Sequence, residues 1–234
     1  MKVSGFTFLR NGQKLGYPFV ASIRSILPIV DEFVVALGPC DDNTEKMLRD
    51  IGDPKIRIIP TQWNERIQPD YSVKGFVYGQ QKSIALFNCT GDWAFYLEAD
   101  EAVHENDLPK IRAVMEKHLS DPRVEALAFD YLHFHGNANT YAWSPGWYRS
   151  EVRIIRNTIP AWRPEGLFFI VLEKHKKGRY PRAALIPADA TGIASTKIMT
   201  AAGSSPLRSS SRKSLTRSRG FPGKWNVWRT AGFI

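Results

Sequence analysis

Apolar residues in the first hundred positions follow two periods that alternate along the chain. Short continuous apolar runs, typical of buried strands, are separated by segments in which apolar residues return every three or four positions, as on one face of a helix. Strands are expected over 2–9, 33–37, 55–59, 93–97, 124–131 and 151–156, and helices over 18–30, 42–51, 75–89 and 108–119. Strands that alternate with helices form βαβ units, so the pattern predicts an α/β fold with a mainly parallel central sheet flanked by helices.

Polar residues follow three of the predicted strands directly. They are Asn11, the segment 38–43 and the segment 98–101. Parallel sheets bind ligands beyond the carboxyl ends of their strands, so these segments are expected to meet at one edge and form a site. The alternative is that each is an ordinary surface turn.

The segment after the fourth predicted strand is rich in acids. The apolar run 93–97 is followed by Glu98, Asp100 and Glu101. Carboxylates on a rigid strand end suit Mg²⁺ or Mn²⁺, which takes one or two protein carboxylates and leaves its other positions to water and substrate phosphate.

The positive charge of the chain is concentrated near its end. The chain of 234 residues has a formal net charge of +9. Ten of its 32 Lys and Arg residues follow Lys177, whereas only one of its 23 Asp and Glu residues, Asp189, does so. The preceding part is therefore balanced in charge, and we expect no nucleic-acid partner.

The last part of the chain also lacks an apolar period. Residues 186–234 are rich in Ser, Arg and Ala, and we predict that they form a disordered basic tail. Two explanations stay open: a basic arm for nucleic acid or an anionic membrane surface, and translation out of frame.

Three further patterns bear on the cellular location. No apolar run approaches the length of about 20 residues that crosses a bilayer, no signal-peptide pattern is present, and Cys40 and Cys89 have neither zinc nor redox spacing. We therefore expect a cytoplasmic protein with reduced thiols, in peripheral contact at most with the inner face of a membrane.

Four motifs in this order resemble those of the family 2 glycosyltransferases of the GT-A fold. The first strand ends at Asn11, and the second leads into an Asp-rich loop that contains Cys40-Asp-Asp-Asn-Thr44. The segment from Gln81-Lys82 to Thr-Gly-Asp92, which includes the second half of the helix expected over 75–89, resembles a helix of the family, and Leu97-Glu-Ala-Asp-Glu101 resembles its metal-binding motif. The resemblance covers residues 1 to about 160.

The resemblance implies an inverting, metal-dependent transferase of the hexosyltransferase class with a nucleotide-diphosphate sugar as donor and a glycan or lipid-linked acceptor. It implies one domain over 1–185, with a donor half over 1–105 and an acceptor half over 106–185. Asp100 would bind the cation, with Glu98 beside it. Contacts with the donor are implied for Leu9, Asn11, Gly38, Asp41, Lys82 and Glu98.

The family chemistry requires a general base, for which Glu165 is the candidate. Its alternative is a turn residue between two strands, and the alternative for Lys82 is a solvated helix residue. Trp143, Trp147 and Tyr148 suggest either an acceptor platform or core packing. His133 and His135 are expected to be partly buried polar residues rather than metal ligands.

Other functions stay open at this point. A nucleotidyltransferase on a similar scaffold would need a phosphate-binding loop after the first strand, where residues 10–16 contain two glycines and a lysine. A truncated acceptor half would leave a catalytically impaired nucleotide-sugar-binding remnant.

Overall fold

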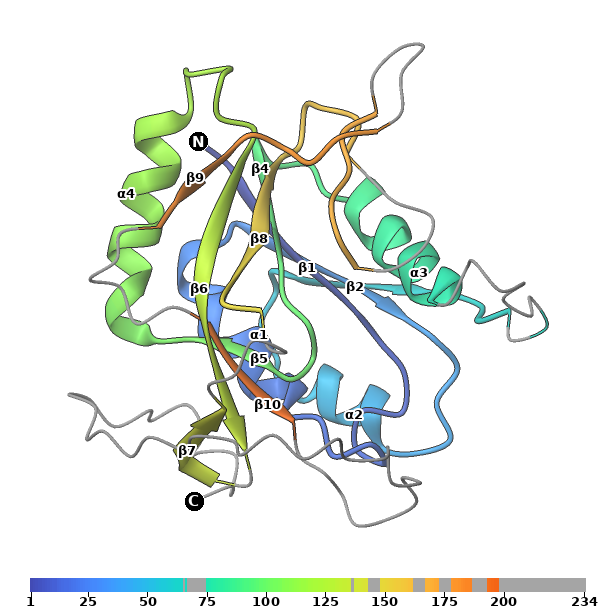
Figure 1. Ribbon diagram of the computed structural model, residues 1–234. Coiled ribbons are helices and arrows are strands. Elements are labelled where there is room, and N and C mark those ends of the chain that lie inside the picture. The colour runs from blue at the N-terminus through green and yellow to red at the C-terminus, as the bar shows by residue number, and fades with distance from the viewer. Residues whose placement is uncertain are drawn as a thin grey trace, which may run out of the picture.

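The computed structural model describes residues 1–64, 66, 75–135, 137–142, 148–161, 167–172, 178–186 and 193–197 (Figure 1). The strands are β1 (Val3–Leu9), β2 (Glu32–Leu37), β3 (Ile56–Pro60), β4 (Trp93–Tyr96), β5 (Glu101–Val103), β6 (Ala126–His135), β7 (Asn137–Ala142), β8 (Ser150–Arg156), β9 (Ala183–Leu185) and β10 (Ile193–Lys197). The helices are α1 (Phe19–Ile26), α2 (Thr44–Arg49), α3 (Phe76–Phe87) and α4 (Leu108–His118), with the short 3₁₀ turns η1 (Leu27–Ile29) and η2 (Glu105–Asp107).

The strands form a mixed sheet in the order β3-β2-β1-β4-β8-β6-β10-β5, and β7 and β9 also pair with β6. The first four strands in this order are parallel to one another, and β8 runs antiparallel to both β4 and β6. The predicted α/β class, with a mainly parallel sheet flanked by helices, is confirmed.

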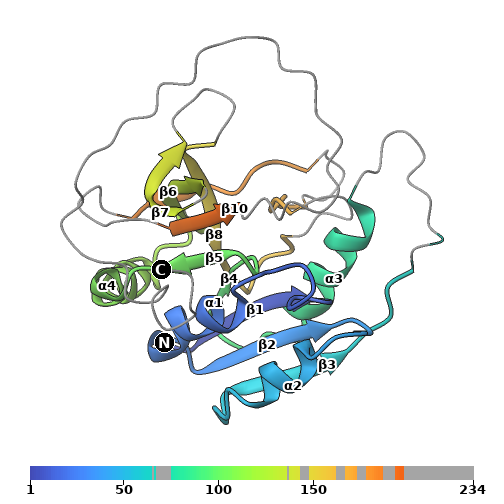
Figure 2. The same ribbon diagram turned by 90° about the horizontal axis from the view of Figure 1, so that it is seen from below.

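Two apolar clusters cover the two faces of the sheet, because successive side chains of a strand point to opposite faces. Phe33 and Val35 of β2 pack in a cluster with residues of α1, α2 and α4. Val34 and Ala36 pack in the other cluster, with Ala85 of α3. Figure 1 shows α3 and α4 on opposite sides of the strands, and Figure 2 shows the same arrangement from below.

Strand β10 corrects one prediction about the tail. It lies within 186–234, where we predicted disorder, and it pairs with β6 and β5. The prediction failed there because the short segment Ile193–Lys197 is stabilised by pairing with distant strands, which its own sequence does not reveal. Residues 198–234 lie outside the described residues.

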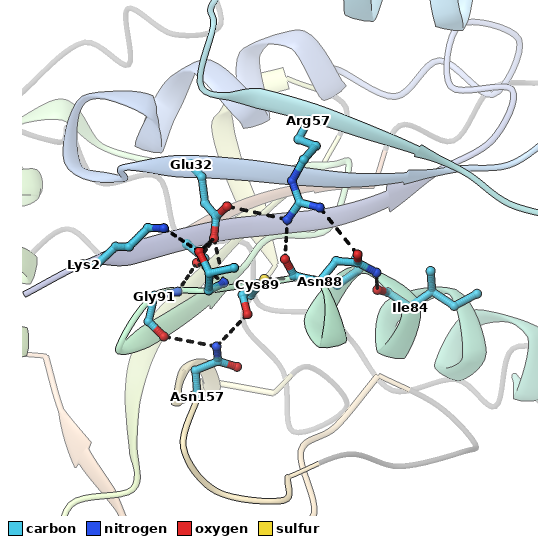
Figure 3. Close-up of polar contacts among 11 residues, drawn as sticks. Lys2, Glu32, Arg57, Ile84, Asn88, Cys89, Gly91 and Asn157 are labelled. Atoms are coloured by element: carbon cyan, nitrogen blue, oxygen red, sulfur yellow. Dashed lines mark hydrogen bonds and ion pairs between the residues drawn. The ribbon is translucent and has the colours of Figure 1, made fainter.

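A polar network joins the amino-terminal ends of β1, β2 and β3 to the turn between α3 and β4 (Figure 3). At its centre, the Glu32 carboxylate accepts hydrogen bonds from Ser4 Oγ (2.6 Å), Thr90 N (2.7 Å) and Thr90 Oγ1 (2.8 Å). Arg57 lies 3.6 Å from the same carboxylate. The network holds together the amino-terminal ends of these strands, whereas the predicted site lies at their carboxyl ends.

Glu32→Ala is therefore expected to lower the free energy of unfolding by about 2–3 kcal/mol, because it leaves these donors without their charged acceptor. Urea unfolding measures the loss. Glu45→Ala is the matched control, since the exposed pair of Glu45 with Arg49 on α2 should contribute less than about 1 kcal/mol. Equal losses in the two variants would contradict this role for Glu32.

Candidate functional site

A cavity of about 500 Å³ lies beyond the carboxyl ends of β1 and β4. It brings together segments that are far apart in the sequence, as the strand pattern predicted. The described lining residues are Phe8, Leu9, Arg10, Asn11, Lys14, Leu15, Tyr17, Trp63, Tyr78, Glu98, Ala99, Asp100 and Leu167. Of the residues predicted for the site, Leu9, Asn11, Glu98 and Asp100 are among them.

The loop after β1 forms one wall of the cavity and is bonded to the loop after β2. Asn11 has a positive φ of 49°, and its side-chain oxygen accepts a hydrogen bond from Asp41 N (2.9 Å). Lys14 Nζ pairs with the Asp41 carboxylate at 2.8 Å. Asp41 is therefore directed to this loop–loop contact and is not among the lining residues of the cavity. A contact between Asp41 and the donor stays a prediction.

Asp42 connects the loop after β1 to the start of α2, whose N-cap position is Asn43. Its carboxylate accepts hydrogen bonds from Thr44 N (2.9 Å), at the start of α2, and from Lys14 N (2.8 Å). These bonds, with the desolvation of the carboxyl working against them, leave the pKa of Asp42 below its usual value. The residue therefore holds the loop after β1 against the start of α2.

The acidic segment after β4 is a tight turn. Glu101 N donates to Glu98 O (3.0 Å), and Glu98 N donates back to the Glu101 carboxylate (3.1 Å). Ala99 and Asp100 are the central residues of the turn, and Asp100 lines the cavity. Glu101 is fully buried and pairs with Arg153, so the three acids are not equivalent.

Glu98 lies between the cavity and the protein interior. Its carboxylate lies 3.0 Å from Arg153 Nη2. Burial, together with the neighbouring Glu101 charge, raises the pKa of Glu98 to about 8, although Arg153 acts in the opposite direction.

Phe8, Trp63 and Tyr78 form an aromatic wall of the cavity. The rings of Phe8 and Tyr78 stack at 6.1 Å between centroids, and Trp63 meets Tyr78 edge to face at 5.8 Å. Arg10 lies over the Trp63 ring, with 5.4 Å from Cζ to the centroid. Together these residues provide an aromatic surface with the Arg10 cation beside it.

Gly38 contributes to this wall by lacking a side chain. A Cβ at Gly38 would come within 2.3 Å of Trp63 Nε1, so the indole occupies the space that any other residue would need. Gly38 itself is not a lining residue. Sequence reasoning missed Trp63, although its position just after β3, at the same edge of the sheet, was a signal that could have identified it.

Lys82, predicted to approach phosphate, is buried in α3 and does not line the cavity. Its Nζ donates to the carbonyl of Leu167 and lies 3.5 Å from the centroid of the Phe169 ring. Burial, followed by the nearby Arg153 charge, lowers its pKa well below the usual value. The alternative of a solvated helix residue is wrong, and the phosphate contact stays a prediction. The basic lining residues are Arg10 and Lys14.

Several predictions concern the acceptor side. Glu165, Trp143 and Trp147 lie outside the described residues, as does the side chain of His135. His133 is buried, with Nε2 at 2.8 Å from the carbonyl oxygen of Tyr148. Its ring contacts those of Tyr131 and Tyr148, which agrees with a packed polar residue.

The donor atoms at the cavity fit a cation that is completed by its substrate. In the described part of the chain, no group of three or more His, Cys, Asp or Glu side chains could hold a metal ion. Mg²⁺ and Mn²⁺ need no such closed set, because one or two carboxylates suffice when water and phosphate supply the other ligands. Asp100 and Glu98 could supply those carboxylates.

Two properties relate to the expected location of the protein. None of the helices in the described residues has the length and apolar character that a membrane crossing requires. Cys40 and Cys89 are both free thiols, as the spacing predicted.

Comparisons with known proteins give limited matches. No protein-family model and no curated protein sequence matches the chain. One similar solved structure is a glucosyl-3-phosphoglycerate synthase from Mycobacterium tuberculosis in complex with Mn²⁺, UDP and phosphoglyceric acid, with 20% identity, a TM-score of 0.38, and coverage of 58% of this chain and 44% of that one.

Another similar structure is S. aureus TarS 1-349 in complex with UDP-GlcNAc, with 15% identity and a TM-score of 0.49. The match covers 84% of this chain and 59% of TarS 1-349, so the chain spans less than two thirds of either structure. Similarity at this level establishes neither a family nor a function for the chain.

Proposed function

We propose that the chain is a glycosyltransferase that uses a nucleotide-diphosphate sugar and a divalent cation, Mg²⁺ or Mn²⁺. The observation that carries this proposal is the cavity at the carboxyl ends of β1 and β4, which is lined both by the acidic turn and by the aromatic wall. A nucleoside diphosphate matches this lining, because its base can stack on the aromatic side chains and its diphosphate can bind a cation held by the acids. Two of the sequence motifs that resemble family 2 glycosyltransferases, Asn11 and the segment 97–101, contribute lining residues to this cavity.

Each wall of the cavity has a separate role in this proposal. Trp63 and Tyr78 offer a surface on which a nucleobase stacks, and Arg10 and Lys14 bring positive charge towards the diphosphate. Asp100, with Glu98 beside it, would hold the cation. Such a cation supplies electrostatic stabilisation to the diphosphate leaving group, which gains negative charge as the glycosidic bond breaks.

The acceptor side belongs to the same proposal. We infer an inverting reaction, in which Glu165 removes a proton from the acceptor hydroxyl of a glycan or lipid-linked acceptor. A cytoplasmic location, with peripheral contact with a membrane, is likewise a proposal.

The loop after β1 disfavours the nucleotidyltransferase alternative. A phosphate-binding loop needs backbone N–H groups that point to the ligand. Here the amides of Asn11, Gln13 and Lys14 donate to Cys40 Sγ, Thr44 Oγ1 and Asp42 Oδ2, all in or next to the start of α2. The amides of Leu15, Gly16 and Tyr17 bond to carbonyls within the loop.

Two assays test the proposal. Melting temperatures are measured with UDP, GDP, ADP or CDP, each with and without MnCl₂, since a ligand of the folded state raises the melting temperature. We expect a Mn²⁺-dependent increase with at least one of them. The matching nucleotide-sugars are then incubated with the protein and MnCl₂.

The products separate the candidate functions. A transferase, even with water as the acceptor, releases the nucleoside diphosphate and sugar, whereas cleavage within the diphosphate releases a nucleoside monophosphate and a sugar phosphate. A Mn²⁺-dependent melting shift without any product would support donor binding alone. No shift with any nucleotide would overturn the proposal.

A further inference from the structure

We propose that Arg153 is a positioning residue of the cavity, which fixes the turn of residues 98–101 so that Asp100 is the carboxylate presented to a divalent cation. This inference rests on the proposed function for the identity of the ligand. It goes beyond that function because it assigns different tasks to Glu98, Asp100 and Glu101, and because it assigns a task to a residue of β8.

The guanidinium of Arg153 contacts both outer acids of the turn. Arg153 Nε lies 2.9 Å from Glu101 Oε2, and Nη2 lies 2.7 Å from Glu101 Oε1 and 3.0 Å from Glu98 Oε1. Bidentate pairing of this kind fixes orientation as well as charge. Arg153 comes from β8, more than fifty residues further along the chain, so it joins the turn to the antiparallel side of the sheet.

Glu101 cannot leave this arrangement without a large cost. Its carboxylate accepts four hydrogen bonds: two from Arg153, one from Tyr131 Oη (3.0 Å) and one from Glu98 N (3.1 Å). The side chains of Arg153 and Glu101 are 3% and 1% exposed. A buried charge that loses its partner is strongly unfavourable, so the pair stays formed.

The carboxylate of Glu101 also determines the shape of the turn. Because it accepts from Glu98 N while Glu101 N donates to Glu98 O, the backbone between the two residues is closed from both sides. Ser22 Oγ adds a bond to Glu98 O at 3.0 Å. The central residue Asp100 is left at the cavity wall, in a backbone geometry that Arg153 maintains through Glu101.

The same contacts divide the charge of the acids. One guanidinium pairs with two carboxylates, those of Glu98 and Glu101, whereas Asp100 is the central acid of the turn and lines the cavity. Arg153 therefore offsets the charge of the two outer acids directly. We infer that the cation binds chiefly to Asp100. Glu98 also lines the cavity, but its carboxylate is shared with Arg153.

Three variants separate this role from a purely structural one. Arg153→Lys keeps the charge but loses the planar fork. The double variant Arg153→Met with Glu101→Met replaces the buried pair by apolar side chains, which is often neutral for stability. Arg156→Met is the matched control, because Arg156 is also on β8 and donates to carbonyls around the end of α4, away from the acidic turn.

Two readouts are measured on the whole chain. The first is Mn²⁺ binding, from the electron paramagnetic resonance signal of free Mn²⁺ in MnCl₂ titrations with UDP, GDP, ADP or CDP, with the nucleotide alone as the blank. The second is amide hydrogen exchange of residues 97–103. We expect both Arg153 variants to bind Mn²⁺ about 10- to 100-fold more weakly, as for residues that orient metal ligands. Exchange in the turn should rise in both. The control should change Mn²⁺ affinity less than about 3-fold and leave exchange in the turn unchanged.

The outcomes distinguish the two proposals. Unchanged exchange in the turn of the Arg153 variants would overturn the positioning role. Faster exchange with unchanged Mn²⁺ affinity would overturn its connection to the cation. If the wild-type chain took up no Mn²⁺ with any of the four nucleotides, the cation would be removed from the proposed function and from this inference, while hydrogen exchange would still decide whether Arg153 fixes the turn.

Discussion

Asp100→Asn is expected to weaken Mn²⁺-dependent binding of a nucleoside diphosphate by at least about 30-fold, which corresponds to about 2 kcal/mol. The substitution keeps the size of the side chain and its place at the cavity wall, but it removes the negative charge that a hard cation requires. Isothermal titration with the nucleotide that stabilises the wild-type chain, with and without MnCl₂, measures the effect.

The control for this experiment is Asp50→Asn. Asp50 follows α2 and pairs with Lys46 on the exposed surface, so the same loss of charge should leave nucleotide affinity unchanged. If Asp100→Asn retained the Mn²⁺-dependent affinity of the wild type, Asp100 would not be the cation ligand. Equal losses in both variants would indicate a general charge effect instead.

Glu101→Met is expected to lower the free energy of unfolding by about 3–5 kcal/mol, because it leaves the buried guanidinium of Arg153 without its main partner. Tyr131 Oη and Glu98 N also lose their acceptor. Equilibrium unfolding in urea measures this loss.

Adding Arg153→Met to Glu101→Met should recover most of that stability, since no unpaired buried charge then remains. A double variant that is less stable than Glu101→Met alone would contradict the description of this pair. The recovery of stability without recovery of Mn²⁺ binding is the combination that a positioning role predicts.

The strand pattern was sufficient to predict the parallel part of the fold. The continuous apolar runs at 33–37 and 93–97 correspond to β2 and β4, which are buried on both faces. Since parallel strands end at a common edge, the meeting of Asn11 with Glu98 and Asp100 at one cavity followed from that pattern.

The partners of the acids could not be predicted in the same way. Glu98, Asp100 and Glu101 look alike in the sequence. Only the pairing of β8 with β4 brings Arg153 into contact with Glu98 and Glu101. The direction of the Lys82 side chain could not be predicted for a related reason, because no local pattern shows that its amine contacts Leu167 and Phe169. Long-range contacts decide such side-chain directions.

The aromatic wall was missed because its members come from three separate segments. Phe8 belongs to β1, Trp63 follows β3, and Tyr78 lies in the first turns of α3. Each reads as ordinary core packing when taken alone, and Gly38 reads as an ordinary turn glycine. Their joint role depends on the indole of Trp63 lying against Gly38, which only the folded chain shows.

The central claim is that Asp100 and the aromatic wall hold opposite ends of one metal-bound nucleotide. Crystals grown with MnCl₂ and the nucleoside diphosphate that gives the largest melting shift test it most directly, through the anomalous scattering of manganese. We predict an anomalous peak within about 2.5 Å of an Asp100 carboxylate oxygen, with the base against Trp63. A peak at another site, or a nucleotide bound outside this cavity, would contradict the account.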